Sequence, residues 1–367
     1  MTVSESAEKS AQISQKSAAF SHAKISVAPM MDWTDRHCRY FLRGFSPRTL
    51  LYTEMITSAA ILRGDRDRLL AYDPEEHPLA LQLGGSEPEE LARAARAGEE
   101  AGYDEINLNC GCPSDRVASG AFGACLMREP DRVAECVAQM RAAVRVPVTV
   151  KMRVGVVNTR AGERREAIAR FDAEDFEALQ AFVRKVRQAG CAVAIIHARK
   201  AMLGGLSPKD NREVPPLRYD VVRRIRESFP ELPLVVNGGI RESPAALAML
   251  GWCDGVMLGR EAYHRPLVLR ELHAALFPGE AARLPASRPF LLERMTRYVE
   301  RELARGERLA SITRHMLGLY GGQPGAREFR RVLSEGSRAA GAGVEVLRHA
   351  GRMVADPAAA ETLADRA

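Results

Sequence analysis

PLALQLGGSEPEELARAARAGEEAGYDEINLNC, residues 78–110, contains the pattern from which the fold class can be predicted. Its two ends, Pro78–Leu83 and Glu105–Cys110, are short apolar runs of the length typical of strands. The segment between them has the apolar spacing of a helix, with Ser86 as the expected N-cap, a proline in the first turn and acidic residues near the N-terminus. A strand, a helix and a second strand in this order predict a βαβ unit and a parallel sheet.

The same alternation extends in both directions from this unit. Eight short apolar runs recur, and helix-periodic stretches separate most of them. The runs are Ile25–Met31, Thr49–Met55, Pro78–Leu83, Glu105–Cys110, Pro147–Met152, Ala192–His197, Pro233–Asn237 and Gly255–Leu258. Eight strand–helix repeats within about 250 residues predict an α/β fold, a (β/α)8 TIM barrel. A doubly wound sheet is the alternative, but the segment VAPMMDWTD after the first run lacks the glycine-rich turn that such a sheet needs.

Three parts of the chain are expected. Residues 1–24 are polar and rich in serine and alanine, without an apolar core of signal-peptide length, so we expect a disordered N-terminal tail. Residues 25–284 hold the predicted barrel. Beyond Pro285 and Pro289 the strand pattern stops, and helical periodicity predicts a small all-α domain over residues 285–367.

The composition excludes several classes of protein. The 367 residues are 46% hydrophobic and 27% charged, which excludes a disordered or fibrous chain. No run of about 18 apolar residues is present, so no membrane span is expected. The seven cysteines are scattered without a CxxC pair, which predicts neither a disulfide framework nor a structural metal site. We therefore expect a protein of the reducing cytoplasm.

The positive charge is almost entirely arginine. The chain has 46 Arg and 7 Lys against 47 acidic residues, for a net charge of +6. A GC-rich coding bias is one interpretation, and contact with a phosphate backbone is the other. The excess is uneven, since residues 288–367 contain 14 Arg and no Lys against 10 acidic residues, a net charge of +4. This location favours a nucleic-acid contact on the helical domain.

Polar residues stand at the ends of the predicted strands, where TIM barrels carry their chemistry. Gln82, Lys151 and His197 each close or follow a hydrophobic run. Each alone also has a structural explanation, such as a snorkelling lysine or a core histidine. Found together at successive strand ends, they predict a site at the carboxyl-terminal mouth of the barrel.

Two further strand ends predict a phosphate-binding site. Asn237–Gly239 follows the seventh run and Gly259–Arg260 follows the eighth, where barrels commonly bind phosphate. Glycines allow backbone N–H groups to approach an anion, and the arginine adds a charged fork. With the other polar strand ends placed to bond a heterocycle, FMN suits this set better than a dinucleotide.

The segment Ile106–Met127 (INLNCGCPSDRVASGAFGACLM) leaves the fourth run as a long loop over the mouth. Cys112 precedes a proline, which favours extended backbone and holds the thiol at the mouth. Cys125 lies in the apolar context ACLM and is expected to be buried for structural reasons. An ordinary thiol ionises near pH ~8.5 and is mostly protonated at neutral pH, which suits a general acid.

A set of strings along the chain resembles the tRNA-dihydrouridine synthases, above all their A-type bacterial members. The resemblance extends from residue 25 to about residue 356. The strings are VAPMMDWTDRHCRYF (27–41), LYTEM (51–55), HPLALQLGGS (77–86), YDEINLNCGCPSDRV (103–117), FGACLM (122–127), VPVTVKMR (146–153), IIHARKA (195–201), LSPKDNREVPPL (206–217), VVNGGI (235–240), GVMLGREAY (255–263) and ITRHMLGLY (312–320).

The resemblance implies a flavin-dependent oxidoreductase that uses FMN and NADPH to reduce the C5=C6 bond of D-loop uridines around positions 20 and 20a of tRNA. Cys112 matches the family's catalytic cysteine, which protonates C5 while C6 receives hydride, and Asn109 matches the asparagine beside the uracil. The matched FMN contacts are Pro29, Met30, Met31, Gln82, Lys151, His197, Asn237, Gly238, Gly239, Gly259 and Arg260. The matched tRNA-binding residues are Lys209, Arg212, Arg327 and Arg330. A monomer without a structural metal is expected.

Two features depart from the family pattern. Cys110 stands where an aliphatic residue is expected in NLNxGCP, so a second thiol lies two residues from Cys112. The stretch 155–175 is longer and more charged than usual, and we expect a solvated insertion rather than an extra tRNA contact.

Three other functions stay open at this point. A flavin enzyme acting on a free pyrimidine, such as a dihydropyrimidine or dihydroorotate dehydrogenase, needs no basic helical domain. A non-catalytic tRNA-binding or folding protein would keep the basic domain and bind no flavin. A phosphosugar isomerase barrel would use the phosphate-binding site without a flavin.

Overall fold

The stretch 78–110 forms the expected unit in a computed structural model of the chain. Strand β3 (Leu79–Gly84), helix α5 (Pro88–Ala101) and strand β4 (Glu105–Cys110) follow one another, and the two strands pair in parallel. The expected N-cap is wrong by one residue. The cap position is occupied by Glu87 without a side-chain bond, and the carbonyl of Ser86 accepts a bond from Arg132 Nε at 2.8 Å.

The structure describes most of the chain, in six segments. These are residues 23–113, 122–158, 168–204, 206–207, 209–284 and 287–354. The expected disordered tail, residues 1–24, lies almost wholly outside them.

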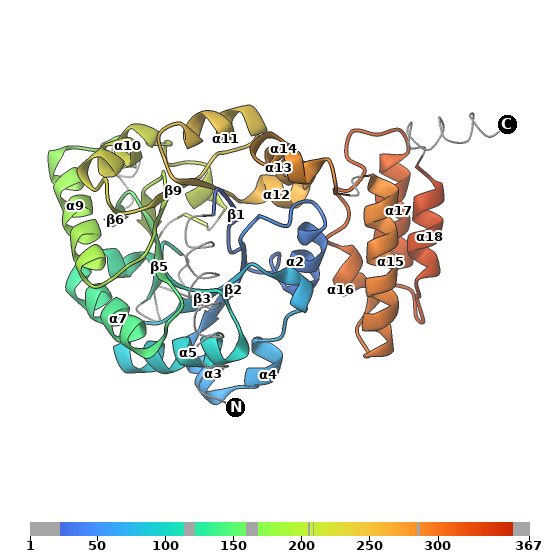
Figure 1. Cartoon of the computed structure of the whole chain (residues 1–367), viewed down its shortest axis with the longest axis horizontal. Helices are drawn as coiled ribbons and strands as arrows, with labels where there is room; N and C mark the ends of the chain where they lie inside the picture. The colour runs from blue at the N-terminus through green and yellow to red at the C-terminus, as the bar shows by residue number, and fades with distance from the viewer. Residues whose placement is uncertain are drawn as a thin grey trace. The chain divides into compact units, whose positions relative to one another are not determined.

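Eight parallel strands form one closed sheet (Figure 1). Besides β3 and β4 they are β1 (Ile25–Val27), β2 (Leu51–Thr57), β5 (Val148–Arg153), β7 (Ala194–His197), β9 (Leu234–Asn237) and β10 (Gly255–Leu258). The sheet runs in the order β1-β10-β9-β7-β5-β4-β3-β2. A parallel bridge between Ser26 and Leu50 joins its two edges, supported by a bond from Val27 N to Leu50 O at 3.0 Å. This closure confirms the TIM barrel and excludes the doubly wound sheet, which stays open.

Helices alternate with the strands and cover the outside of the barrel (Figure 1). Helix α5 packs against α7 (Pro130–Ala143), α7 against α9 (Ala173–Gln188), and α9 against α10 (Tyr219–Ser228). The other helical elements of this part are α3 (Ser58–Arg63), α4 (Arg66–Leu69), η1 (Pro74–Glu76), η2 (Gly123–Arg128), η3 (Asp210–Arg212) and α11 (Ser243–Leu250).

A second, two-stranded sheet was not predicted. Strand β6 (Val156–Asn158) pairs in parallel with β8 (Ala201–Leu203). Strand β6 belongs to the charged stretch 155–175, so the start of that stretch is paired backbone. Residues 159–167 of the stretch lie outside the described residues.

Side chains alternate along each strand, and the inward set decides what the barrel contains. The inward set is marked by one buried cluster: Ala28, Leu50, Tyr52, Ala80, Val193, Ile195, Val235 and Met257. Gln82, His197 and Asn237 each lie two positions beyond a member of this cluster on the same strand, so they share its inward face. The interior therefore combines this cluster with buried polar side chains of β4 and β5 (Glu105, Asn107 and Thr149) and with polar strand ends at the carboxyl-terminal mouth.

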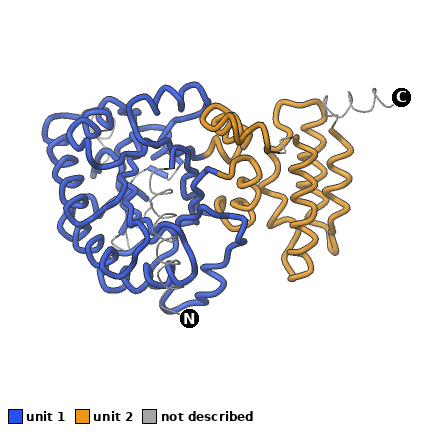
Figure 2. The backbone as a smooth tube through the Cα atoms, in the orientation of Figure 1, with its two compact units in different colours: residues 1–31, 48–259 blue, residues 32–47, 260–367 orange. Residues whose placement is uncertain are grey.

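Contacts divide the chain into two compact units, residues 1–31 with 48–259 and residues 32–47 with 260–367 (Figure 2). Every described secondary-structure element of the second unit is a helix, which confirms the helical C-terminal region. Its helices are α2 (Arg36–Arg43), α12 (Arg260–His264), α13 (Leu267–Leu276), α14 (Pro278–Ala281), α15 (Arg288–Ala304), α16 (Leu309–Thr313), α17 (Ala326–Gly336) and α18 (Glu345–Arg352). A functional boundary at residue 284 stays a prediction.

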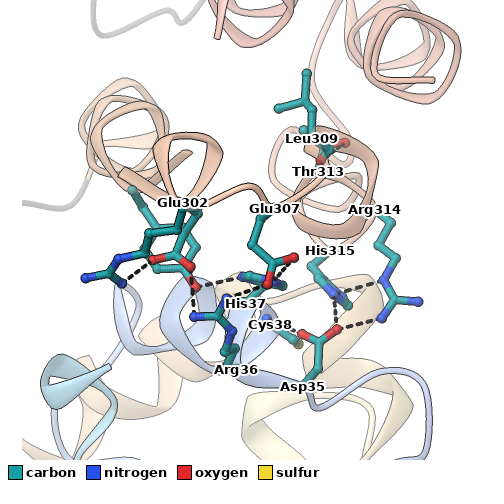
Figure 3. Close-up of polar contacts among 12 residues, drawn as sticks. Asp35, Arg36, His37, Cys38, Glu302, Glu307, Leu309, Thr313, Arg314 and His315 are labelled. Atoms are coloured by element: carbon teal, nitrogen blue, oxygen red, sulfur yellow. Dashed lines mark hydrogen bonds and ion pairs between the residues drawn. The ribbon is translucent and has the colours of Figure 1, made fainter. Parts of the chain in front are cut away.

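Helix α2 is held within the second unit by ion pairs (Figure 3). Arg36 pairs with the buried Glu302 at 2.8 Å. Asp35, the N-cap of α2, binds Arg314 at 2.6 Å and His315 at 3.0 Å. Burial alone would raise the pKa of Asp35, but the bonds from His315, from a backbone N–H and from Arg314 hold it well below its usual value. The Asp35 carboxylate is thus ionised, and its oxygens have hydrogen-bond partners.

No helix among the described residues is long and apolar enough to cross a membrane. The same residues contain no group of three His, Cys, Asp or Glu side chains that could hold a metal ion. All seven cysteines are free thiols.

Candidate active site at the barrel mouth

Strand register brings the polar strand ends to one rim. Asn109 lies opposite Lys151, Arg153 opposite His197, and His197 opposite Asn237. These five residues come from four neighbouring strands. Because the carboxyl ends of parallel strands meet at one edge of a barrel, the predicted site residues of the strands lie together.

Asn109 holds the start of the loop that carries Cys112. Its side-chain oxygen accepts bonds from the backbone N–H groups of Gly111 at 3.0 Å and Cys112 at 2.6 Å. Its amide nitrogen donates to Gln82 Oε1 at 2.8 Å. Gln82 is 1% exposed and Asn109 is 7% exposed, whereas the Cys112 side chain is half-buried. The thiol therefore stands on a fixed support at the mouth.

Arg153 is a site residue that the sequence reasoning missed. Its Nε donates to Gly111 O at 2.9 Å, and its Nη1 donates to Lys200 O at 3.0 Å and Asn211 O at 2.8 Å. Among the described residues it makes no ion pair with a carboxylate, although it is only 4% exposed. Its position two residues beyond Lys151 on an alternating strand is the signal that identifies it as inward-facing.

Three basic side chains, Lys151, Arg153 and His197, gather at the mouth. Burial, together with the nearby Arg153, lowers the pKa of Lys151 to about 7. Burial lowers the pKa of Arg153 to about 9, and Arg212 contributes in the same direction. Burial and these same cations lower the pKa of His197 well below its usual value, so the imidazole is neutral. A site of this kind favours an anionic ligand, which would restore the charge of the lysine.

His197 presents a polar atom that lacks a partner. Its Nδ1 is buried and has no hydrogen bond among the described residues. Glycines keep the space around it: a Cβ on Gly238 would lie 2.8 Å from His197 Cδ2, and one on Gly239 would lie 2.4 Å from Leu217 Cδ1. Both glycines have positive φ, 109° and 71°. A Cβ on Gly259 would meet nothing within 4 Å. The arrangement leaves a polar donor or acceptor and open space for a ligand.

The remaining predicted cofactor contacts border the strand ends. Pro29 and Met30 follow β1 and are half-buried, and Met31 is 56% exposed. Arg260 begins α12 and belongs to the second compact unit. A role in cofactor binding stays a prediction for these four residues, as it does for the other predicted contacts.

Lys209 and Arg212 lie at η3 and are both exposed. Arg212 is close enough to the rim to lower the pKa of His197 and of Arg153. The structure therefore brings one of the two predicted tRNA contacts of this loop toward the mouth.

Arg327 and Arg330 are exposed on α17, in the second unit. Neither side chain makes an ion pair or hydrogen bond to another described residue. The adjacent Arg331 differs, since it pairs with Glu328 and with Glu335. Two of the three arginines on this helix thus keep their charge available to a ligand.

The two other thiols of the loop region differ from Cys112 in burial and in their partners. Cys110 is fully buried and, by the strand alternation, faces the outer side of the barrel. Burial raises the pKa of the Cys110 thiol well above its usual value, so it stays protonated and does not compete with Cys112. Cys125 lies in η2, half-buried rather than fully buried, and its Sγ donates to Phe122 O at 3.0 Å. Residues 114–121, between these segments, lie outside the described residues.

Known proteins with similar sequences agree with this picture. Residues 26–354 match the family described as "Dihydrouridine synthase (Dus)". The chain is 53% identical over 335 residues to the tRNA-dihydrouridine(20/20a) synthase of Xanthomonas campestris pv. campestris, which covers 91% of this chain and 95% of the relative. It is 52% identical over 334 residues to the protein of that name from Escherichia coli K12, with 91% and 92% covered. The Vibrio cholerae protein of that name is 52% identical over 328 residues, with 89% and 95% covered.

These matches extend over the barrel and the helical C-terminal region alike. They include the strand ends that form the rim and the loop that begins at Asn109. Dihydrouridine synthases are flavin-dependent oxidoreductases, and the closed barrel with polar strand ends at its mouth is an architecture suited to that chemistry. Because the match covers nearly the whole chain and the fold agrees with it, this chain belongs to the dihydrouridine synthase family.

Proposed function

We propose that this protein is a tRNA-dihydrouridine synthase that reduces the C5=C6 bond of D-loop uridines at positions 20 and 20a, with FMN as cofactor and NADPH as reductant. The observation that carries the proposal is the half-buried thiol of Cys112, whose backbone N–H is tied to Asn109 at 2.6 Å beside a rim of positive charge. The names of the relatives supply the positions on tRNA.

The residues of the mouth fit FMN. The buried Nδ1 of His197 is available to bond a heterocycle, and the lowered pKa of Lys151 shows a lysine that gains from a nearby anion. The glycines at 238 and 259 keep room for a phosphate, to which Arg260 would add a charged fork. With FMN held by these residues and NADPH as reductant, the site would have the hydride chemistry that reduction at C6 of the uracil requires.

Cys112 supplies the proton that C5 takes up. Saturating a C=C bond takes one hydride and one proton, so a protonated thiol is sufficient and a histidine base beside it is not needed. The loop is fixed from two sides. Asn109 binds its N–H groups, and Arg153 donates to Gly111 O at 2.9 Å. A thiol held in this way keeps its distance from the reacting carbon, which general acid catalysis requires.

The substrate uridine must leave the folded tRNA before it enters the mouth, which costs a few kcal/mol of unstacking. Contacts of Lys209, Arg212, Arg327 and Arg330 with the phosphate backbone would offset this cost and set the register. The protein would act as a monomer in the cytoplasm, and the free thiols suit a reducing compartment.

Purified protein tests the proposal. It should be yellow, oxidise NADPH, and form dihydrouridine in unmodified tRNA. In a deletion strain, tRNA should lose dihydrouridine at positions 20 and 20a and retain it elsewhere. Turnover of free uracil or orotate would instead indicate a free-pyrimidine enzyme. A colourless protein that binds tRNA would indicate a binding protein, and turnover of a phosphosugar without flavin absorbance would indicate an isomerase.

A further inference from the structure

A continuous chain of hydrogen bonds crosses the barrel interior to the loop that carries the thiol. Asn109 Nδ2 donates to Gln82 Oε1 at 2.8 Å, and Gln82 Nε2 donates to Asn107 Oδ1 at 2.8 Å. Asn107 Nδ2 donates to Thr149 Oγ1 at 2.8 Å, and Thr149 Oγ1 donates to Glu105 Oε1 at 2.6 Å. All five residues are buried. Buried amide and hydroxyl groups that are all hydrogen-bonded in this way are each held in one orientation.

The groups at both ends of this hydrogen-bond chain fix the same donor-to-acceptor direction along it. At the mouth, the backbone N–H groups of Gly111 and Cys112 only donate, so the oxygen of Asn109 faces them and its nitrogen faces inward. At the other end, Glu105 Oε1 accepts from both Thr149 and Tyr52, so the hydroxyl of Thr149 donates to it and accepts from Asn107. A flipped amide between them would place donor against donor, or acceptor against acceptor, in a buried site.

The two ends differ in rigidity. Glu105 and Thr149 are the first or second residues of paired strands, β4 and β5. At the mouth end, Asn109 also lies on β4, but the two N–H groups it binds belong to loop residues Gly111 and Cys112. The carboxylate end is therefore held by strand pairing on both sides, whereas the mouth end is held by strand pairing on one side only.

Glu105 is a buried carboxylate held by hydroxyl groups. Tyr52 donates to the same Oε1 at 2.5 Å, and Glu105 makes no ion pair with any described residue. Burial raises the pKa of Glu105 to about 7, the bonds from Thr149 and Tyr52 act against that rise, and Asp104 adds to it. At pH 8 the carboxylate form prevails.

We propose that Glu105 is a positioning residue, which through Thr149 and Asn107 holds the amide of Gln82 in the one orientation that FMN contacts, and the amide of Asn109 in the one that receives the Cys112 loop. This inference rests on the proposed function, because it takes Gln82 as a flavin contact. Without an acceptor at position 105, the hydroxyl of Thr149 no longer has to donate downwards, and one of the two constraints on the direction of the hydrogen-bond chain is lost. The amides of Asn107 and Gln82 are then oriented from the mouth alone, and Gln82 is held less firmly toward the cofactor.

Equilibrium binding of FMN to the full-length protein at pH 8, followed by flavin fluorescence, tests the inference. Glu105→Met and Thr149→Val should each weaken FMN binding about fivefold, the size of one net hydrogen bond. The double variant should be no weaker than either single variant, because both changes break the same chain. Glu105→Gln retains an oxygen acceptor and should bind FMN within about twofold of the unaltered protein.

Tyr52→Phe is the matched control. It removes the bond to Glu105 Oε1 and the contact of the Tyr52 hydroxyl with Thr149, but every bond of the chain from Glu105 to Gln82 stays in place, so FMN binding should stay within about twofold. In turnover, Thr149→Val should lower kcat more than it changes KM for tRNA, because the support of the thiol is loosened. Thr149→Val and Glu105→Gln carry the test if Glu105→Met does not fold.

Three results would overturn the inference: unchanged FMN binding in Thr149→Val, equal weakening by Tyr52→Phe, or additive losses in the double variant. Failure of the unaltered protein to bind FMN is a different result. It would remove the proposed function and this inference with it.

Discussion

At the scale of single residues, two thiols close to the same loop are held in different ways. The backbone of Cys112 is tied to Asn109 at the mouth, whereas Cys125 bonds the carbonyl of Phe122 within η2. Cys112→Ala should therefore abolish dihydrouridine formation and leave FMN bound, while Cys125→Ala should retain turnover. Single-turnover oxidation of the reduced enzyme by tRNA measures both. Turnover that survives in Cys112→Ala and disappears in Cys125→Ala would reassign the acid.

Gly259 offers a test of where the cofactor lies. Its Cβ position is open and its φ is not positive, so Gly259→Ala should hardly change the free energy of unfolding of the cofactor-free protein. The added methyl group enters the space expected for the phosphate, and FMN should bind about tenfold or more weakly. Gly279→Ala is the control, since its Cβ position is also open and it lies in α14. Equal FMN affinity in the two variants would place the phosphate elsewhere.

Glu105 should also appear in the pH dependence of stability. Burial raises its pKa from 4.5 to about 7 in the folded protein, so between these values the folded state binds the extra proton. Stability from this group is complete below pH ~4.5 and is lost as the pH rises through ~7, by about 3 kcal/mol in total. Urea unfolding of the unaltered protein and of Glu105→Gln at a series of pH values measures the difference. Parallel pH profiles of the two proteins would contradict it.

At the scale of elements, helix α17 should carry a phosphate-binding face. Arg330 makes no ion pair with a described residue, whereas Arg331 is neutralised by Glu328 and Glu335. Arg330→Gln should therefore weaken tRNA binding and lower the slope of log affinity against log salt by about one, while Arg331→Gln should change both less.

The double change Arg327→Glu with Arg330→Glu should weaken tRNA binding further and leave FMN in place. Equal effects of the two single glutamine variants would show that net charge alone, and not this face, attracts tRNA. Unchanged tRNA affinity in the double variant would favour coding bias as the origin of the arginines.

The elements themselves were predicted with uneven success, for physical reasons. Strands β4 and β10 have the predicted bounds, because apolar runs with turn residues beside them leave little choice. The first strand ends at Val27 rather than Met31, since the residues beyond it leave the sheet for the mouth. The β6–β8 pair went unpredicted because three-residue strands carry too little periodicity to be seen.

At the scale of the whole molecule, helix α15 depends on a segment far away in the chain. Tyr40 of α2 stacks on Tyr298 with ring centroids 3.9 Å apart, and Arg294 Nη1 donates to Tyr40 O at 2.8 Å. A fragment of residues 285–367 alone would expose Leu291 and its neighbours on α15, which are buried in the complete chain.

The fragment 285–367 should therefore lack a cooperative thermal transition, measured by circular dichroism. Joining residues 32–47 and 260–284 to it should restore one. Cooperative unfolding of 285–367 by itself would show that residue 285 is an independent folding boundary.

Short apolar runs separated by helix-periodic stretches were enough to predict the barrel, and polar residues at the strand ends were enough to predict Gln82, Lys151, His197 and Asn237 at its mouth, because both are local properties of the chain. The family and Asn109 were predicted from motif resemblance, and the strand register brings these site residues together. Arg153 was missed because its partners are carbonyls at Gly111, Lys200 and Asn211, far apart along the chain.

The partners of these residues follow from the three-dimensional packing of the chain. The chain from Glu105 to Asn109 alternates between three strands, and the membership of residues 32–47 in the helical unit depends on contacts more than 250 residues apart in sequence. Hydrogen bonds and ring contacts depend on distances in space, which local sequence patterns do not encode.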